Sequence, residues 1–275
     1  MGPSGSAEGV VDAVSAHQAF YVPVGDGWLA TPLTRGPWDG RFQHGGPPSA
    51  LATGALARFG DDASAWFLAR VTVELLRPVP LGRVELEVVP ERLGRGVQRL
   101  EAVLSVDGRP VLAARGLRIR RERTAVPAVT MPAPWPDPDA CGELVFSFFR
   151  DELAYHRAVA LRTAHGVWGS TPIGVWGRPR VPLVAGRPDL PRERVLVLAD
   201  AQSGMGVPLD PASWSFVNPD LTVYFERDPL DGWLGYDIRS TACSEGVGLA
   251  QSAIRDRAGL CARAAQSLFV APRGA

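Results

Sequence analysis

Residues 97–120 read VQRLEAVLSVDGRPVLAARGLRIR, and this stretch decides the fold. Apolar side chains take alternate positions up to the dipeptide Asp107-Gly108 and return beyond it; they are Leu100, Ala102, Leu104 and Val106, then Val111, Ala113, Leu117 and Ile119. A period of two is typical of half-buried antiparallel strands, and Asp-Gly favours the tight turn between them. The alternation extends backward into residues 83–88, so residues 69–120 are expected to form a meander.

The same pattern occurs again over residues 219–270. Identical residues stand 150 positions apart; the pairs are Thr72-Val73 with Thr222-Val223, Arg77 with Arg227, Gly82 with Gly232, and Gly96-Val97 with Gly246-Val247. One inserted residue then makes the spacing 151, which matches Gly108 with Gly259 and Leu117 with Leu268. Unrelated segments rarely hold register over ~50 residues with one gap, so the sequence predicts an internal duplication with Thr72 and Thr222 at equivalent positions.

One helix is expected ahead of each repeated stretch. Residues 47–60 follow Gly45-Gly46, and a second helix opens at Asp189-Leu190-Pro191 and continues to Ala199. Both segments are apolar on nearly every side, so neither can lie on a surface. The fold class predicted is α+β, with two curled antiparallel sheets that each wrap one central helix.

The chain divides around a proline-rich segment. Residues 123–142 read RTAVPAVTMPAPWPDPDACG and predict an extended linker across the surface. We therefore expect one unit over residues 17–122 and another over residues 143–272. Residues 1–16 are small and polar, and we expect them to be partly disordered.

Composition excludes several classes of function. Twenty-nine basic and twenty-nine acidic residues balance, so no net charge would attract nucleic acid. No lysine occurs, which excludes Schiff-base and P-loop lysine chemistry. No apolar run approaches the ~18 residues of a membrane span, and the first basic residue is Arg35, so we expect a cytoplasmic protein. Three cysteines without a CxxC pair favour free thiols over a zinc site, and no metal or cofactor is expected.

Common catalytic motifs are absent from the sequence, so polar residues on apolar elements carry the argument. Asp200 follows five apolar residues on the second helix, Asn218 precedes a strand, and Gln266 shares a strand face with Leu268. Each has a purely structural explanation: a turn-capping aspartate, an Asx turn, and an amide bonded to backbone. At the offsets above, however, their counterparts in the first half are Ala50, Leu68 and Arg115. Because residues that merely build the fold should occur in both copies, this asymmetry favours a single site in the second half.

A known family resemblance rests on short motifs in a fixed order. They are Phe42-Gln43-His44-Gly45-Gly46, Leu76-Arg77-Pro78, Leu198-Ala199-Asp200, Asn218-Pro219-Asp220, Phe225-Glu226-Arg227-Asp228-Pro229 and Ala265-Gln266. From about Trp38 onward the chain resembles the acyl-CoA thioesterase II family and its thioesterase-like relatives. The resemblance implies a double hotdog fold, an acyl-CoA or other acyl thioester substrate and a homo-oligomer. The composition described above predicts no nucleic-acid or membrane partner.

The resemblance also implies roles for site residues. In the family, an aspartate, a threonine and a glutamine hold a water molecule; the aspartate and glutamine match Asp200 and Gln266, whereas Asn218 stands at the threonine position. Asp200 would act as the base for a water that attacks the thioester directly. Gly45-Gly46, at the start of the first helix, is the candidate oxyanion hole, although close packing explains the same glycines equally well.

Other assignments stay open at the level of the sequence. His44 is interpreted as a turn or capping residue, and no chemistry is assigned to the other histidines. A hotdog hydratase or dehydratase would need a histidine shortly after an aspartate, and none follows Asp220. A non-catalytic acyl-thioester binding or assembly module is the other alternative, because a fold does not determine a function and Asn218 departs from the family pattern.

Overall fold

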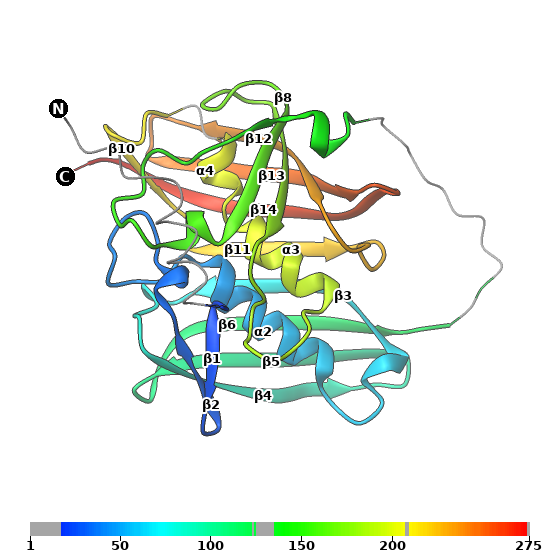
Figure 1. Cartoon of the computed structure of the whole chain (residues 1–275). Coiled ribbons are helices and arrows are strands. Elements are labelled where there is room, and N and C mark those ends of the chain that lie inside the picture. Colours follow the sequence, from blue (N-terminus) through cyan, green and yellow to red (C-terminus); the bar gives the residue numbers. More distant parts are fainter. Residues whose placement is uncertain (1–17, 123, 125–134, 207–208, 274–275) are drawn as a thin grey trace.

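The computed structural model describes residues 18–122, 124, 135–206 and 209–273. Within them, antiparallel strands form one sheet in the order β1-β2-β4-β5-β6-β3-β11-β14-β13-β12-β9-β8-β7, and β10 pairs with β14 (Figure 1). The strands of the first half are β1 (Tyr21–Val24), β2 (Gly27–Ala30), β3 (Trp66–Leu75), β4 (Arg83–Leu93), β5 (Val97–Val106) and β6 (Arg109–Arg120). Those of the second half are β7 (Gly142–Glu143), β8 (Val159–His165), β9 (Ile173–Pro179), β10 (Trp214–Val217), β11 (Asp220–Phe225), β12 (Leu234–Ala242), β13 (Val247–Asp256) and β14 (Gly259–Pro272).

The predicted hairpin at residues 97–120 is confirmed. Strands β5 and β6 pair antiparallel, and the inward side chains of Leu100, Ala102 and Leu104 are fully buried. Asp107 and Gly108 have φ angles of 49° and 72°, which is the left-handed conformation that a two-residue hairpin turn requires. The positive φ angle therefore explains why the second residue of this turn, Gly108, is a glycine.

The expected meander is wrong in one respect. Strands β4, β5 and β6 follow one another in the sheet, but β3 pairs with β6 and not with β4. In the second half β11 likewise pairs with β14. Alternating hydrophobicity indicates which face of a strand is buried, but it does not indicate which strand lies alongside.

The two halves meet where β3 pairs with β11. Thr72 lies directly opposite Thr222, and the Thr222 hydroxyl donates to Thr72 Oγ1 at 3.2 Å. Through this pair the strands of both halves join into one hydrogen-bonded sheet, a connection that the sequence pattern did not reveal. The two threonines, which we expected at equivalent positions of the two halves, indeed lie opposite each other where the halves meet. The duplication itself stays a prediction.

Strand pairings repeat between the halves at a constant spacing of 150. Ala102 pairs with Ala114, and Ser252 pairs with Ala264; the pairs at the two ends of each hairpin follow the same rule. The inserted residue expected after Gly108 is therefore wrong, because Gly259 begins β14 and corresponds to Arg109.

This register corrects one assignment of the sequence analysis. The counterpart of Gln266 is Gly116, not Arg115: Leu100 pairs with Gly116, and Ala250 pairs with Gln266. Gln266 is buried, as is Gly116, whereas Arg115 lies on the exposed face and forms ion pairs with glutamates. The asymmetry between the halves holds, because the first half has no polar side chain at this position.

Helices α2 (Gly46–Arg58), α3 (Pro191–Ala199) and α4 (Gln202–Gly206) lie on the inner face of the sheet. The first agrees with the helix expected over residues 47–60, and α2 packs against α3. The second predicted helix ends at Asp200 and is followed at once by α4. Short 3-10 turns complete the secondary structure: η1 (Pro32–Thr34), η2 (Ala63–Ala65), η3 (Pro138–Ala140) and η4 (Tyr155–Arg157).

Between α2 and α3 lies a buried carboxylate. Glu193 is fully buried and accepts hydrogen bonds from Arg58 at 2.6 Å, Arg187 at 2.8 Å and the Leu190 amide at 2.7 Å. Because Arg58 belongs to α2, this cluster ties the helices of the two halves together.

Part of the proline-rich segment packs against the second half. Trp135 meets Trp176 edge to face, with ring centroids 5.2 Å apart, and η3 follows it. Residues 125–134 and the N-terminal residues 1–16 lie outside the described part of the chain, so the expected linker, disorder and domain boundaries stay predictions. Within the described residues, no helix has the length and apolar character needed to cross a membrane.

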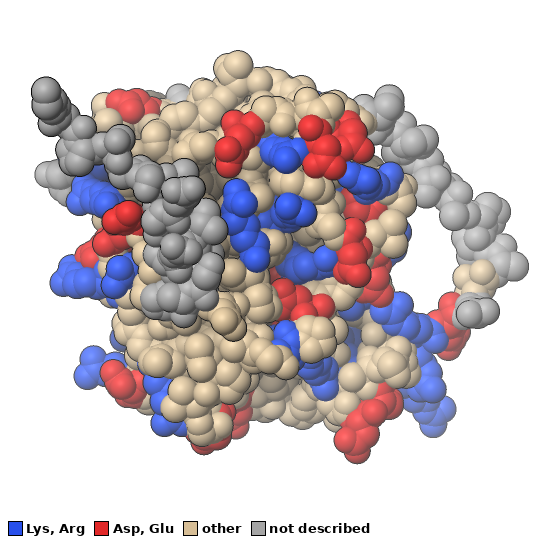
Figure 2. All heavy atoms as spheres, in the orientation of Figure 1, with Lys and Arg blue, Asp and Glu red and all other residues tan. Residues whose placement is uncertain are grey.

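Charged side chains of both signs are intermixed on the molecular face shown in Figure 2. Many of the arginines stand beside a carboxylate, as Arg162 does beside Asp139 at 2.9 Å and Arg257 beside Asp137 at 3.4 Å. Positive and negative charges are thus balanced in the sequence as a whole and also among neighbouring side chains on this face.

Candidate functional site

Asp200 is held at the junction of the two halves. It caps the C-terminal end of α3, and its carboxylate is only 4% exposed. A Cβ atom on Gly45 would lie 2.8 and 2.9 Å from the two carboxylate oxygens, so only glycine lets the start of α2 approach this closely. The N-terminal end of a helix dipole favours negative charge, and α2 therefore stabilises the carboxylate.

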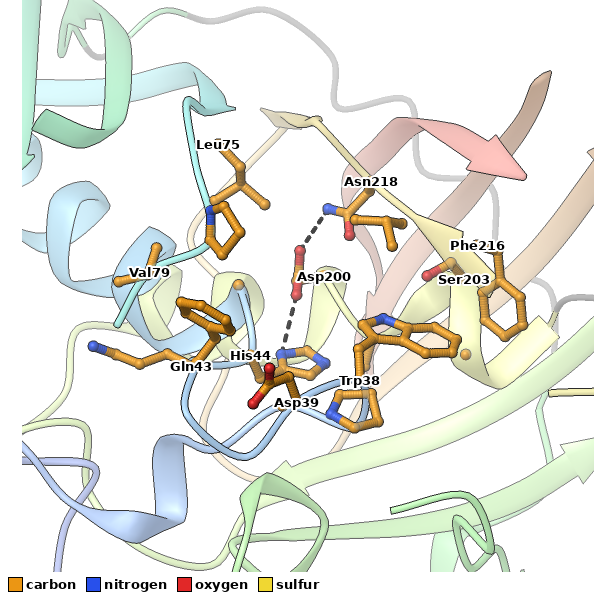
Figure 3. Close-up of a pocket in the computed structure, with 18 of the residues that line it drawn as sticks. Trp38, Asp39, Gln43, His44, Leu75, Val79, Asp200, Ser203, Phe216 and Asn218 are labelled. Carbon is orange, nitrogen blue, oxygen red and sulfur yellow. Dashed lines mark hydrogen bonds and ion pairs between the residues drawn. The ribbon is translucent and has the colours of Figure 1, made fainter. Parts of the chain in front are cut away.

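Asn218 contacts this carboxylate from the connection between β10 and β11. Its Nδ2 donates to Asp200 Oδ1 at 2.7 Å (Figure 3). More weakly, it donates to the Asp220 carbonyl at 3.4 Å. Both amide hydrogens are thereby used. The Asn218 Oδ1 accepts no hydrogen bond from a described residue, so it can accept one from a bound molecule.

His44 contacts the other carboxylate oxygen. Its Nδ1 lies 3.0 Å from Asp200 Oδ2 and 3.1 Å from the Gly46 amide that donates to it. Burial lowers the pKa of His44 although Asp200 opposes this effect, and the ring stacks on Tyr155 at 3.8 Å. The predicted capping role agrees with the Gly46 contact, but the contact with Asp200 was missed because nothing in the sequence relates residues 44 and 200.

Gln266 lies behind Asp200 and not beside its carboxylate. Its Nε2 donates to the Asp200 main-chain carbonyl at 3.4 Å, and its Oε1 accepts from Gln202 Nε2 at 3.1 Å. Of the three predicted residues, the structure thus brings the side chains of Asp200 and Asn218 together, and Gln266 reaches only the backbone of Asp200. Gln202 was missed, although its counterpart at the spacing of 150 is Ala52, so the asymmetry argument could have found it.

The candidate oxyanion hole offers fewer amides than a helix N-terminus normally does. Pro47 and Pro48 carry no N–H group, and the Gly46 amide is used by His44. Gly46 also packs tightly, since a Cβ there would lie 2.3 Å from the Val197 carbonyl oxygen. Of the two glycines, Gly45 lines the cavity and Gly46 does not. The Gly45 amide donates to no described residue.

A cavity of about 560 Å³ opens onto Asp200, Asn218 and Gly45. Both halves contribute to its wall. The first half provides residues 36–39, 42–45 and 75–79, and the second half provides residues 146, 148–149, 200–201, 203–204, 216–219 and 269. Its surface is largely apolar. Among the described residues, no three His, Cys, Asp or Glu side chains are grouped as they would be to hold a metal ion.

The site thus combines a buried carboxylate, a polar partner and an apolar cavity. Similarity to known proteins identifies the family of the chain. Residues 34–119 match the acyl-CoA thioesterase N-terminal domain, and residues 124–270 match the acyl-CoA thioesterase C-terminal domain. The chain therefore belongs to the acyl-CoA thioesterase family. No match to it was found among curated proteins.

Solved structures agree on the fold. The chain is similar to a conserved protein of unknown function with a hot dog fold from Alicyclobacillus acidocaldarius, at 18% identity over 94% of this chain and 98% of that one, with a TM-score of 0.71. It is also similar to a tesB protein of Mycobacterium avium subsp. paratuberculosis, at 21% identity over 97% and 100%, with a TM-score of 0.63. An acyl-CoA thioesterase II of Mycobacterium marinum is 18% identical over 84% and 91%, with a TM-score of 0.62. These likenesses identify the hotdog fold.

Proposed function

We propose that this protein hydrolyses acyl-CoA to a free acid and coenzyme A, with Asp200 as the base for direct attack of water. One observation carries the proposal: the carboxylate of Asp200 is buried at the wall of an apolar cavity and accepts a hydrogen bond from Asn218 at 2.7 Å. Family membership supports the reaction class. No covalent enzyme intermediate is needed.

The attacking water would lie between Asp200 and Asn218. Each carboxylate oxygen keeps a lone pair beyond those that face Asn218 and His44, so Asp200 can accept one water hydrogen. The Asn218 Oδ1 can accept the second hydrogen, which directs a water lone pair toward the thioester carbonyl. Attack then forms a tetrahedral intermediate, and its collapse expels the coenzyme A thiolate, which recovers the proton from Asp200.

The Gly45 amide is the proposed donor to the oxyanion. It lines the cavity, donates to no described residue, and lies at the positive end of α2. Gly46 contributes through the close packing of α2, because its own amide is used by His44. His44, Gln202 and Gln266 act as positioning residues: His44 Nδ1 accepts from the Gly46 amide and so orients the start of α2 beside the carboxylate, and the two glutamines hold the turn that follows α3.

Arg77 is the proposed contact for a phosphate of coenzyme A. Its counterpart, Arg227, makes two hydrogen bonds to Asp256 at 2.5 and 2.6 Å. At the position that corresponds to Asp256 the first half has Val106, and Arg77 is exposed, lines the cavity and forms no ion pair with a described residue. A guanidinium without a carboxylate partner at the mouth of the cavity suits a phosphate, which arginine can bind with two parallel hydrogen bonds.

The finer architecture is also a proposal. We infer two hotdog units, near residues 17–122 and 143–272, that arose by duplication and each enclose one helical segment. The constant spacing of 150 between equivalent strand pairs supports this. We further propose a cytoplasmic homo-oligomer, and light scattering on the purified protein measures the number of subunits.

Hydration of an enoyl thioester is a second candidate. It is favoured by one observation, the imidazole of His44 at 3.0 Å from Asp200, since hotdog hydratases use an aspartate with a histidine. Hydration adds water across the carbon–carbon double bond of an enoyl-CoA and releases no thiol. Hydrolysis releases the thiol and leaves that double bond in the free acid.

The deciding experiment incubates the purified protein with a panel of acyl-CoAs, one enoyl-CoA included, and measures released thiol. The free thiols of Cys141 and Cys243 set a constant background, whereas burial raises the pKa of Cys261 to about 12 and keeps it unreactive. Asp200→Asn should lower kcat by ~10²–10⁴. Asp26→Asn is the matched control, because Asp26 lies in the exposed turn between β1 and β2. Full activity in a folded Asp200→Asn protein would exclude this mechanism, and binding without turnover in the wild type would indicate a binding module.

A further inference from the structure

Five aromatic rings line one part of the cavity and contact one another. They belong to Trp38, Phe146, Phe148, Phe149 and Phe216, and we call them the aromatic wall. Trp38 meets Phe216 edge to face, with centroids 5.0 Å apart and planes at 89°, and meets Phe148 at 6.1 Å. Phe148 in turn lies 5.4 Å from both Phe146 and Phe149. The wall is therefore continuous and combines residues from the two halves of the chain.

This wall leads directly to the proposed base. Phe149 lies 6.3 Å from Tyr155, which stacks on His44 at 3.8 Å, and His44 contacts the Asp200 carboxylate. Because Asp200 and the aromatic wall line the same cavity, a substrate whose reacting carbonyl is at Asp200 can extend its acyl group along these rings.

The cavity differs on the other side of Asp200. In Figure 3, Leu75 and Val79 are drawn on one side of the carboxylate, and Trp38, Phe216 and Ser203 on the other. Leu75 and Val79 belong to the segment of residues 75–79, which also carries Arg77. We therefore assign the side with the Arg77 cation to the carrier, and the side with Trp38 and Phe216 to the acyl group.

Ser203 adds a polar group to the acyl side. It is buried on α4 and lines the cavity, and its hydroxyl makes no hydrogen bond to a described residue. A hydroxyl without a protein partner among apolar rings favours a ligand that supplies the missing partner.

We propose that the natural acyl group carries an aromatic ring, and that Ser203 hydrogen-bonds a polar substituent on that ring. This inference rests on the proposed thioesterase function and names its substrate class. Rings prefer edge-to-face and offset contacts at centroid distances of 4.5–7 Å, and these contacts add to the burial of area that any apolar group gains. A saturated chain of equal size obtains only the burial.

The first experiment compares kcat/KM for three thioesters with acyl groups of eight carbons: phenylacetyl-CoA, cyclohexylacetyl-CoA and octanoyl-CoA. The first two have the same shape apart from ring saturation. Phenylacetyl-CoA should be preferred by roughly 3- to 10-fold over each of the others. Equal or better use of cyclohexylacetyl-CoA or octanoyl-CoA would overturn the ring preference.

Two variants locate the preference. Trp38→Leu should bring the ratio of phenylacetyl to cyclohexylacetyl close to one, whereas Trp214→Leu, on an exposed tryptophan outside the cavity, should leave the ratio unchanged. A ratio measured within one variant does not depend on how much of that variant is folded. An unchanged ratio in Trp38→Leu would remove the aromatic wall from the explanation.

The role of Ser203 is tested with the three hydroxyphenylacetyl-CoA isomers. One isomer should exceed phenylacetyl-CoA in the wild type, and Ser203→Ala should reduce that advantage by roughly 3- to 10-fold. If none of the isomers is preferred, the assignment to Ser203 is wrong.

Failure of this inference can be distinguished from failure of the proposed function. Calorimetric binding of the same thioesters to Asp200→Asn reports on the acyl side without turnover. Tighter binding of phenylacetyl-CoA than of octanoyl-CoA, with an inactive wild type, would reject hydrolysis and retain the ring preference. Rapid hydrolysis of octanoyl-CoA with no ring preference would retain hydrolysis and reject the ring.

Discussion

At the scale of single residues, the site depends on which groups surround one carboxylate. Asp200 meets Asn218 on one oxygen and His44 on the other, with Gly45 against both. Asn218 occupies the position where the family resemblance implies threonine. An amide donates to the carboxylate as a hydroxyl would, and it also offers its own carbonyl oxygen to the water.

Asn218→Thr should therefore keep activity within about tenfold of the wild type, because a hydroxyl both donates and accepts. Asn218→Ala removes the donor to Asp200 Oδ1 and the acceptor for the water, and should lower kcat by about 10- to 100-fold. Steady-state kinetics on one acyl-CoA measures both. Equal activity of the alanine and threonine variants would contradict the role given to the side chain.

Histidine protonation should make stability depend on pH. Burial, the charge of Arg157 and the opposing charge of Asp151 set the pKa of His156, which is lowered to about 4, and burial lowers the pKa of His44. The unfolded chain has ordinary histidines near 6.5, so between about pH 4 and 6.5 it binds more protons than the folded chain. Stability is therefore complete above pH 6.5 and is lost as the pH falls toward 4.

The melting temperature of the wild type and of His156→Phe, measured from pH 7.5 to 4.5, checks this. The phenylalanine variant should lose less of its melting temperature on acidification, since it removes one group that must be protonated. Parallel curves for the two proteins would show that His156 does not contribute.

At the scale of elements, the junction of α2 with α3 positions the site. Glu193 ties Arg58 of α2 to the first turn of α3, and the C-terminal end of α3 carries Asp200. The carboxylate also accepts from Arg187. Loosening this cluster should therefore affect stability first and the geometry of Asp200 second.

Glu193→Gln should destabilise the protein by about 1–3 kcal/mol, because three donors lose a buried, charged acceptor. The cost stays below that of a fully buried pair, since Arg58 and Arg187 are about one-third exposed and can turn toward water. Glu226→Gln, in an exposed pair with Arg263, is the matched control and should change stability by less than about 1 kcal/mol. Denaturant unfolding measures both, and equal stability of the two variants would contradict the assignment.

At the scale of the whole molecule, repetition of the strands separates common structure from the single site. Arg227 and Arg77 occupy matching positions, but among the described residues Arg227 has a carboxylate partner, Asp256, whereas Arg77 has none. One copy of this arginine is thus structural. The other is available at the cavity.

Arg77→Ala should raise KM for acyl-CoA several-fold with little change in kcat or melting temperature, because it removes an exposed contact to phosphate. Arg227→Ala should do the opposite, lowering the melting temperature with little effect on KM. Added salt should raise KM in the wild type more than in Arg77→Ala, since exposed charge contacts are screened. A salt-insensitive KM, with equal activity on short thioesters that lack the nucleotide, would indicate that coenzyme A is not the natural carrier.

The sequence by itself indicated the strands of the two repeated stretches, the two main helices, and Asp200 and Asn218 as polar residues that the first half lacks. Alternation at residues 97–120 and the Asp107-Gly108 turn are local signals, and local geometry alone decides them. The comparison of the two halves pointed to Asp200 and Asn218, because their counterparts in the first half, Ala50 and Leu68, are apolar.

Only the tertiary structure decided how these elements meet. Pairing of β3 with β11, contact of His44 with Asp200, and the place of Gln266 behind the carboxylate join residues that are 64 or more positions apart. The register that corrects the counterpart of Gln266 to Gly116 is likewise a property of hydrogen-bonded strands. A one-residue shift moves a side chain to the other face of a sheet, and the pairing of strands, which the linear order of residues does not encode directly, selects the face.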